Sequence, residues 1–285
     1  MPVKHCIDGD NINWLCPVNW DEPLNDGLVA RYQVFQNQPG WQSGQLLNLV
    51  DPLYGIHGTL TNMVPQTSYQ GPLGRPGGFG SLLFAGGGTN AVTHARPFEN
   101  IAAFSVSFWL RPTTTPTAGQ DIHGKWDNGG ATTQQFSRWL GGVNWFVNNA
   151  ANSATQNITI SDSIVLIGAW TFITLVADGA NLIGYANGVE KTSAALAGPY
   201  IPAGDTIDWK IAGVIRDSSA PASFDSFAYR SRGLNAADAW ALYQEEQTGN
   251  PQTINRVRPY TVFDVGGGGG ARKVLPGNLK FAVAA

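Results

Sequence analysis

The sequence predicts an all-β protein, a two-sheet sandwich of the jelly-roll type with one short helix near its C-terminal end. Three observations support this prediction: many short segments alternate between apolar and polar residues, turn-forming pairs separate them, and a helical pattern occurs convincingly once. The composition agrees, because 35 glycines, 10 tryptophans and only 13% charged residues suit a protein rich in turns. We expect an extended N-terminal arm and a C-terminal tail to flank the sandwich.

The clearest strand signals lie in the middle of the chain. Residues 103–111 alternate between apolar and other side chains, which is typical of a half-buried strand. Residues 170–177 are apolar on nearly both sides and predict a central strand. Asp-Gly at 178–179 and Asn-Gly at 187–188 favour tight hairpin turns, so three consecutive antiparallel strands are expected here. The other predicted strands are 28–35, 81–85, 90–95, 134–140, 143–148, 156–160, 207–214 and 223–230.

One helix is predicted after the last strand of the sandwich. Asn235 can cap it, with Asp238 at the third helical position as in a capping box. Glycine and proline within 248–251 end it. The residues expected on its apolar face are Ala236, Ala239, Trp240 and Tyr243.

The chain divides into an arm at 1–26, the sandwich at 27–250 and a tail at 251–285 with a run of five glycines that reads as a flexible hinge. The arm has a net charge of −4 and the tail a net charge of +4. Opposite charges favour head-to-tail attraction between neighbouring copies, although chance could also produce the asymmetry. The candidate assembly residues are Asp8, Asp10, Arg256, Arg258, Arg272 and Lys273. The two cysteines of the arm, Cys6 and Cys16, are either reduced thiols or a short-range disulfide.

Several functional classes lack support in the sequence. The net charge of −3 gives no basic footprint for nucleic acid. No segment approaches the roughly 20 apolar residues of a membrane span. The first residues carry no apolar signal-peptide core, so a virion or cell-surface location would be reached without a recognisable signal peptide.

Three segments carry a family resemblance. They are FSVSFWLRP at 104–112, WTFITLVADGANLIGYANGV at 170–189 and FDSFAYRSRGLNAADAWALY at 224–243. In this order and at these intervals they resemble the laminin G-like (LamG/pentraxin-type) domains of the concanavalin A-like lectin/glucanase superfamily. The resemblance covers about residues 27–250 and implies a concanavalin A-like jelly roll. Segments 27–35, 57–63 and 75–80 resemble a subgroup of bacterial and phage structural proteins.

The same resemblance implies a calcium ligand. Members of the family often bind calcium through the first aspartate of the third segment, which is Asp225 here. A second family loop corresponds to 84–92, where both carboxylates are missing. Calcium prefers six to eight oxygen ligands, so Asp225 alone is a partial site. The alternative for Asp225 is a turn or cross-strand hydrogen bond.

The glucanases of the superfamily carry Glu-x-Asp-x-x-Glu on one strand, which supplies a nucleophile and a general acid. None of the five glutamates of this chain lies in that pattern. There is also no Gly-x-Ser-x-Gly elbow and no His-x-x-x-His pair. We therefore expect a protein that is not an enzyme.

Two functions remain open. The first is a non-enzymatic structural or interaction protein, such as a capsid decoration, fibre or surface-assembly subunit that forms homo-oligomers. The second is a carbohydrate-binding adhesion module for surface glycans, because flat aromatic rings beside amide donors suit sugar rings. The candidate glycan-binding residues are Trp126, Trp139, Trp145, Asn144 and Asn148. The alternative for the tryptophans is a core or subunit-contact role.

Overall fold

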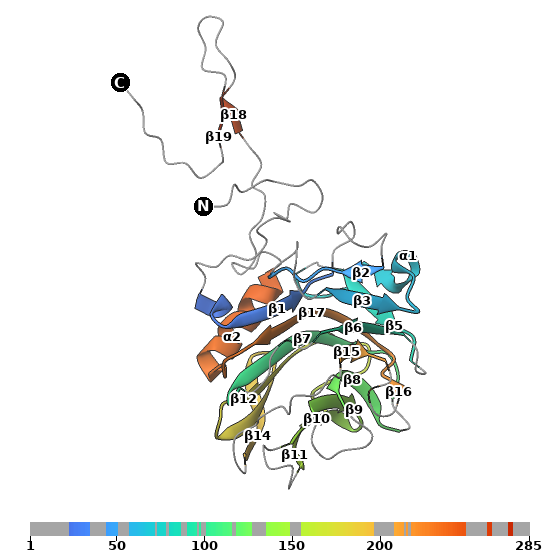
Figure 1. The fold of residues 1–285 in the computed structure, drawn as a ribbon, viewed down its shortest axis with the longest axis vertical. Coiled ribbons are helices and arrows are strands. Elements are labelled where there is room, and N and C mark those ends of the chain that lie inside the picture. Colours follow the sequence, from blue (N-terminus) through green and yellow to red (C-terminus); the bar gives the residue numbers. More distant parts are fainter. Residues whose placement is uncertain are drawn as a thin grey trace, which may run out of the picture.

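The computed structural model shows two curved sheets packed face to face, which confirms the predicted all-β sandwich (Figure 1). The residues that it describes are 23–34, 44–50, 57–71, 73–77, 80–86, 90–95, 97, 101–115, 118–126, 135–148, 155–196, 208–213, 215, 218–248, 261–263 and 273–275. Nearly all strand pairs are antiparallel; the exception among the described strands is the parallel pairing of Ser218 and Ser219 with Gln120 and Asp121.

The first sheet runs in the order β14-β13-β12-β7-β17-β5-β4, with β1 also paired to β17. Its strands are β1 (Leu28–Tyr32), β4 (Tyr69–Gln70), β5 (Ser81–Phe84), β7 (Phe104–Pro112), β12 (Thr171–Ala177), β13 (Asn181–Ala186), β14 (Val189–Ala195) and β17 (Ala222–Arg230). The predicted run of three antiparallel strands is confirmed as β12, β13 and β14. On the side of β17 that faces away from β7, its first residues (222–224) pair with β5 and its last residues (227–230) pair with β1.

The second sheet runs in the order β11-β10-β9-β8-β15-β6-β3-β2, and β16 adds to β8 in parallel. Its strands are β2 (Gln45–Leu46), β3 (Gly58–Thr61), β6 (Ala91–His94), β8 (Gln120–Lys125), β9 (Gln135–Trp139), β10 (Gly142–Asn148), β11 (Thr155–Ser161), β15 (Trp209–Ala212) and β16 (Ser218–Ser219). A separate pair joins β18 (Thr261–Phe263) to β19 (Lys273–Leu275).

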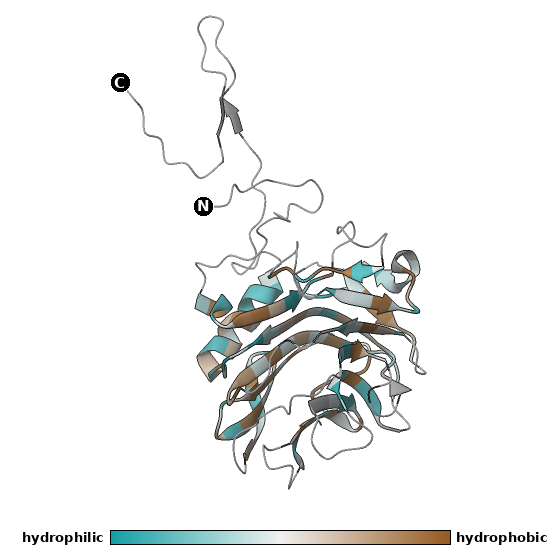
Figure 2. Cartoon of the chain, viewed as in Figure 1, coloured by the Kyte–Doolittle hydropathy of each residue, from teal (hydrophilic) through white to brown (hydrophobic). Residues whose placement is uncertain are grey.

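The core between the sheets is rich in aromatic side chains, and Figure 2 shows the hydrophobic residues concentrated along the strands. Phe108 stacks on Phe227 with ring centroids 4.6 Å apart. The buried His94 places Nε2 3.2 Å from the Tyr229 hydroxyl. Burial lowers the pKa of His94 to about 4, so its ring is neutral at pH 7. Each large apolar side chain removed from water contributes roughly 1.5–3 kcal/mol to folding.

The predicted helix is confirmed as α2 (Ala236–Thr248), which covers the outer face of the first sheet (Figure 1). Its capping box is formed, because the Asp238 amide donates to Asn235 Oδ1 (2.9 Å) and the Asn235 amide to Asp238 Oδ2 (3.3 Å). Of the predicted apolar face, Ala239 is buried and Tyr243 packs against the same cluster, but Trp240 is 48% exposed and Ala236 is also exposed. Leu242, which was not predicted on that face, is buried beside Ala239. Two shorter helical turns, η1 (Pro23–Asn25) and α1 (Pro65–Ser68), complete the described helices.

The sandwich begins before residue 27. Leu24 packs in the cluster under α2, and its carbonyl accepts a hydrogen bond from Arg230 Nε (2.9 Å). The side chains of the assembly candidates and the two arm cysteines lie outside the described residues, although the backbone of Lys273 begins β19. In the part of the chain that the structure describes, no helix is both long enough and apolar enough to cross a bilayer.

Candidate functional site

The predicted tryptophan platform does not form. Trp145 is fully buried and packs edge-to-face on Phe104, with ring centroids 5.8 Å apart. Trp139 is only 2% exposed. Both rings point into the core. The alternation of side chains along a strand predicts which residues share a face, but it does not predict which face turns inward. Trp126, the residue directly after β8, is half-buried.

Asn144 is also not a free donor for a sugar. Asn144 Nδ2 donates to the carbonyls of Leu140 (2.6 Å) and Gly142 (3.2 Å), and Oδ1 accepts from the Thr159 hydroxyl (2.8 Å). Asn144 therefore holds the β9–β10 turn in place. Asn148 ends β10, and its side chain lies outside the described residues.

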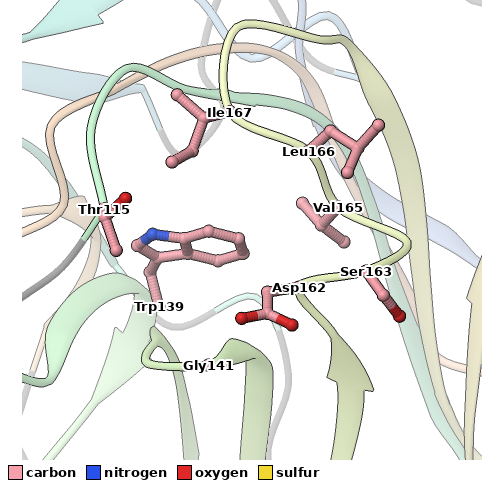
Figure 3. Close-up of a pocket in the computed structure, with 8 residues that line it drawn as sticks. All are labelled: Thr115, Trp139, Gly141, Asp162, Ser163, Val165, Leu166 and Ile167. Atoms are coloured by element: carbon pink, nitrogen blue, oxygen red, sulfur yellow. The ribbon is translucent and has the colours of Figure 1, made fainter.

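A pocket of about 400 Å³ lies at one end of the sandwich (Figure 3). Three segments form it: the β9–β10 turn, the loop between β11 and β12, and the residues after β7. Its lining consists of Thr115, Trp139, Gly141, Asp162, Ser163, Val165, Leu166 and Ile167. Sequence reasoning found only Trp139 of these. The signal it missed was a run of aliphatic residues, 164–167, inside an otherwise polar turn.

Backbone hydrogen bonds hold the pocket loops together. The Asp162 amide donates to the Gly141 carbonyl (3.3 Å), which ties the β11–β12 loop to the β9–β10 turn. The Gly168 amide donates to the Pro112 carbonyl (2.8 Å), and Arg111 Nε donates to the Gly168 carbonyl (2.9 Å). These contacts anchor both ends of the loop, so the pocket is formed without a ligand.

The pocket combines an apolar wall with a few polar groups. Leu166 and Ile167 are 54% and 47% exposed, which is unusual for large aliphatic side chains. Asp162 accepts from the Ser161 hydroxyl (3.3 Å), and no described residue bonds its other carboxylate oxygen. The Trp139 ring nitrogen is buried and has no hydrogen-bond partner among the described residues. Figure 3 shows that nitrogen on the Thr115 and Ile167 side of the ring, with Asp162 and Ser163 beyond the opposite side.

Asp225, the residue expected to bind calcium, instead binds an arginine. Its Oδ2 lies 2.7 Å from Arg75 Nε and 2.9 Å from Gln33 Nε2, while its Oδ1 accepts from the Val34 amide (2.8 Å). Donors thus face both carboxylate oxygens of Asp225, an arrangement that does not suit a calcium ligand. The alternative expectation, a turn or cross-strand hydrogen bond, fits these contacts, because Val34 follows β1, the strand that pairs with β17. Within the described residues, no group of three or more histidine, cysteine or acidic side chains is placed to hold a metal.

A second buried carboxylate completes this ion cluster. Glu246 of α2 accepts from Arg31 Nη2 (2.5 Å), Arg75 Nη2 (2.7 Å) and the Ser226 hydroxyl (3.0 Å). Burial favours a raised pKa for Glu246, but the two guanidinium groups outweigh burial and lower it. Burial raises the pKa of Asp225 to about 6, against the opposing effect of Arg75. We call Arg31, Arg75, Asp225 and Glu246 the ion cluster.

The ion cluster is a structural feature and offers no route to substrate. Both carboxylates are about 1% exposed, and the Trp109 ring covers the Arg75 guanidinium at 5.0 Å. A glycosidase needs its two carboxylates on either side of an accessible sugar bond. The pocket of Figure 3, by contrast, is open to solvent and carries one carboxylate, Asp162.

Comparison with known proteins agrees with this fold. Among solved structures, the binding domain of Paraclostridial Mosquitocidal Protein 1 is similar, with a TM-score of 0.58 and 15% identity over 77% of this chain and 52% of that one. The receptor binding domain of botulinum neurotoxin type G gives a TM-score of 0.55 and 16% identity over 77% of this chain and 51% of that one. The binding domain of botulinum neurotoxin DC, solved in complex with SialylT, gives a TM-score of 0.55 and 16% identity over 79% of this chain and 52% of that one.

This chain thus spans about half the length of those toxin domains. No curated protein matches its sequence. A family model described as the concanavalin A-like lectin/glucanases superfamily matches residues 85–239, which is more than half of the chain. That match includes β7, β12, β13 and β17, the strands at the centre of the first sheet. The chain therefore belongs to the concanavalin A-like lectin/glucanases superfamily.

Proposed function

We propose that this chain is a non-enzymatic recognition module that binds carbohydrate in the pocket of Figure 3. The observation that supports it is the preformed pocket itself, which joins an apolar wall to a carboxylate and hydroxyl groups at one end of the sandwich. Sugar rings present apolar C–H faces and hydroxyl groups in the same way. The similar toxin domains are described as binding domains, one of them in complex with SialylT, which gives the proposal independent support.

The described pocket lining has too few carboxylates for glycosidase chemistry, which supports a binding role over an enzymatic one. Asp162 is the sole carboxylate among the lining residues, and both retaining and inverting glycosidases need two. The sequence also lacks Glu-x-Asp-x-x-Glu, the carboxylate pattern of the glucanases in this superfamily. We expect the full chain to leave the glycans that it binds unchanged.

A glycan array with the full chain tests the proposal. We expect binding to a defined subset of glycans, and loss of that binding for Leu166→Ala and for Asp162→Asn. Leu73→Ala is the matched control, since Leu73 is also an exposed leucine, at 44%, but lies outside the pocket lining. A chain that binds no glycan, or variants that bind as well as the control does, would contradict the proposal.

A second candidate function is assembly into a virion or a cell-surface lattice, either alone or with glycan binding. The opposite net charges of residues 1–26 and 251–285 favour contacts between the ends of neighbouring copies. Light scattering on the full chain and on a chain limited to residues 23–250, which keeps the buried Leu24, tests this. We expect an oligomer that falls to monomer on trimming and weakens as salt rises. A full-length monomer at low salt would remove the assembly role.

A further inference from the structure

We propose that the pocket of Figure 3 binds the acetamido group of a neutral N-acetylated sugar, with the methyl group against the aliphatic wall and the carbonyl oxygen at the Trp139 ring nitrogen. This inference rests on the proposed function and deepens it by naming the ligand class. The two ends of the pocket are chemically different: one has the indole nitrogen of Trp139 beside Ile167, and the other has the polar groups of Asp162 and Ser163.

The first feature is the unpaired donor. The Trp139 nitrogen is buried without a partner, and a buried N–H that lacks an acceptor is costly to the protein. A ligand carbonyl oxygen would satisfy it. A hexose hydroxyl can also accept this hydrogen bond, but its own O–H would then need a partner, so the acetamido carbonyl suits this apolar end of the pocket better. The nitrogen is covered in the free pocket. Binding therefore includes a side-chain rearrangement beside it, and the half-exposed Ile167 on that side of the ring is the residue that we expect to turn towards solvent when the acceptor binds.

The second feature is the aliphatic wall. Val165, Leu166 and Ile167 line the pocket, while the face of Trp139 is almost wholly covered. A sugar ring that binds by stacking needs an exposed aromatic face, which this pocket lacks. A methyl group fits an aliphatic wall better than hydroxyl groups do.

The third feature is the charge at the opposite end. The free carboxylate oxygen of Asp162 and the Ser163 hydroxyl are placed to bond sugar hydroxyl groups. The same carboxylate repels an acidic sugar. The pocket therefore favours a neutral N-acetylhexosamine over a sialic acid, although both carry an acetamido group.

The test compares three probes on the full chain: N-acetylglucosamine, glucose and N-acetylneuraminic acid. We expect N-acetylglucosamine to bind at least about tenfold more tightly than glucose, the scale of one well-placed apolar group. It should also bind more tightly than N-acetylneuraminic acid. In saturation-transfer NMR, the acetyl methyl protons should receive the strongest transfer.

Variants separate the two contacts. Trp139→Phe removes the N–H and keeps most of the ring, so we expect it to abolish the preference for N-acetylglucosamine over glucose. Because Trp139 lies in the core and its variant could be unstable, the exposed Ile167→Asp provides a second test, with Val64→Asp as its exposed control. Ile167→Asp should lose N-acetylglucosamine binding and Val64→Asp should not.

The outcomes distinguish this inference from the proposed function. Equal binding of glucose and N-acetylglucosamine, or binding of some other glycan alone, overturns the acetamido inference and leaves carbohydrate binding standing. An array on which no glycan binds overturns both.

Discussion

Substitution of Glu246 tests whether the ion cluster holds α2 on the sandwich. Its carboxylate meets Arg31, Arg75 and the Ser226 hydroxyl at distances between 2.5 and 3.0 Å. Glu246→Gln keeps the side-chain volume and removes the charge. Asp225 alone then balances two buried guanidinium groups, so the interior carries an uncompensated positive charge.

The expected cost follows from that imbalance. Removing one partner of a buried ion pair destabilises a protein by about 3–5 kcal/mol. The glutamine oxygen still accepts one hydrogen bond, so we expect the lower end, about 3 kcal/mol. For a domain of this size, that corresponds to a fall in Tm of about 6–12 °C. Urea unfolding followed by tryptophan fluorescence measures the free-energy change.

Glu190→Gln on β14 is the matched control, because Glu190 is exposed and its substitution should cost less than about 0.5 kcal/mol. A Glu246→Gln loss below 1 kcal/mol, or one equal to that of the control, would refute the reasoning. It would mean that packing of Ala239 and Leu242, rather than charge, holds the helix on the sheet.

Three further predictions concern stability. His94→Gln should reduce the acid sensitivity of the fold. The pKa of His94 is about 4 in the folded state against 6.5 in the unfolded chain, so the unfolded chain binds more protons between these pH values. The free energy of unfolding of the wild type should therefore fall by about 3 kcal/mol relative to the variant as pH falls from 6.5 to 4, which urea unfolding at each pH measures. Gly188→Ala should cost more than Gly168→Ala in thermal melts, since both glycines have a φ of +76° but only at Gly188 would the new Cβ lie 2.9 Å from the Trp240 backbone; equal losses would contradict this. Asn235→Ala should lower the free energy of unfolding by about 1 kcal/mol through loss of the helix cap, and an unchanged value would mean that the cap is dispensable.

The sequence predicts the strands and the helix well where the signal is local. Alternation at 103–111 and the turn pairs at 178–179 and 187–188 depend on neighbouring residues, and β7, β12, β13 and β14 follow them. The Asn235 cap is likewise a contact between residues three apart.

The sites were harder to predict because they depend on residues far apart in the chain. Asp225 is an arginine partner only because Arg75, 150 positions earlier, reaches it through the fold. The direction in which Trp139 and Trp145 point depends on which side of the second sheet faces the first, and alternation alone is the same for either side. The pocket depends on three segments that meet in space, so its aliphatic residues looked like an irregular turn in the sequence.

The position of β17 between β7, β5 and β1 has a consequence for biosynthesis. During translation, β1 emerges about 200 residues before its partner, and the β4–β5 hairpin also waits for β17 to complete the sheet. The strands β7, β12, β13 and β14 can pair with one another meanwhile. We therefore expect the nascent chain to expose unpaired N-terminal strand edges until residue 230 has left the ribosome. Folding should consequently be slow and chaperone-sensitive, because long-range pairing is the step that completes it.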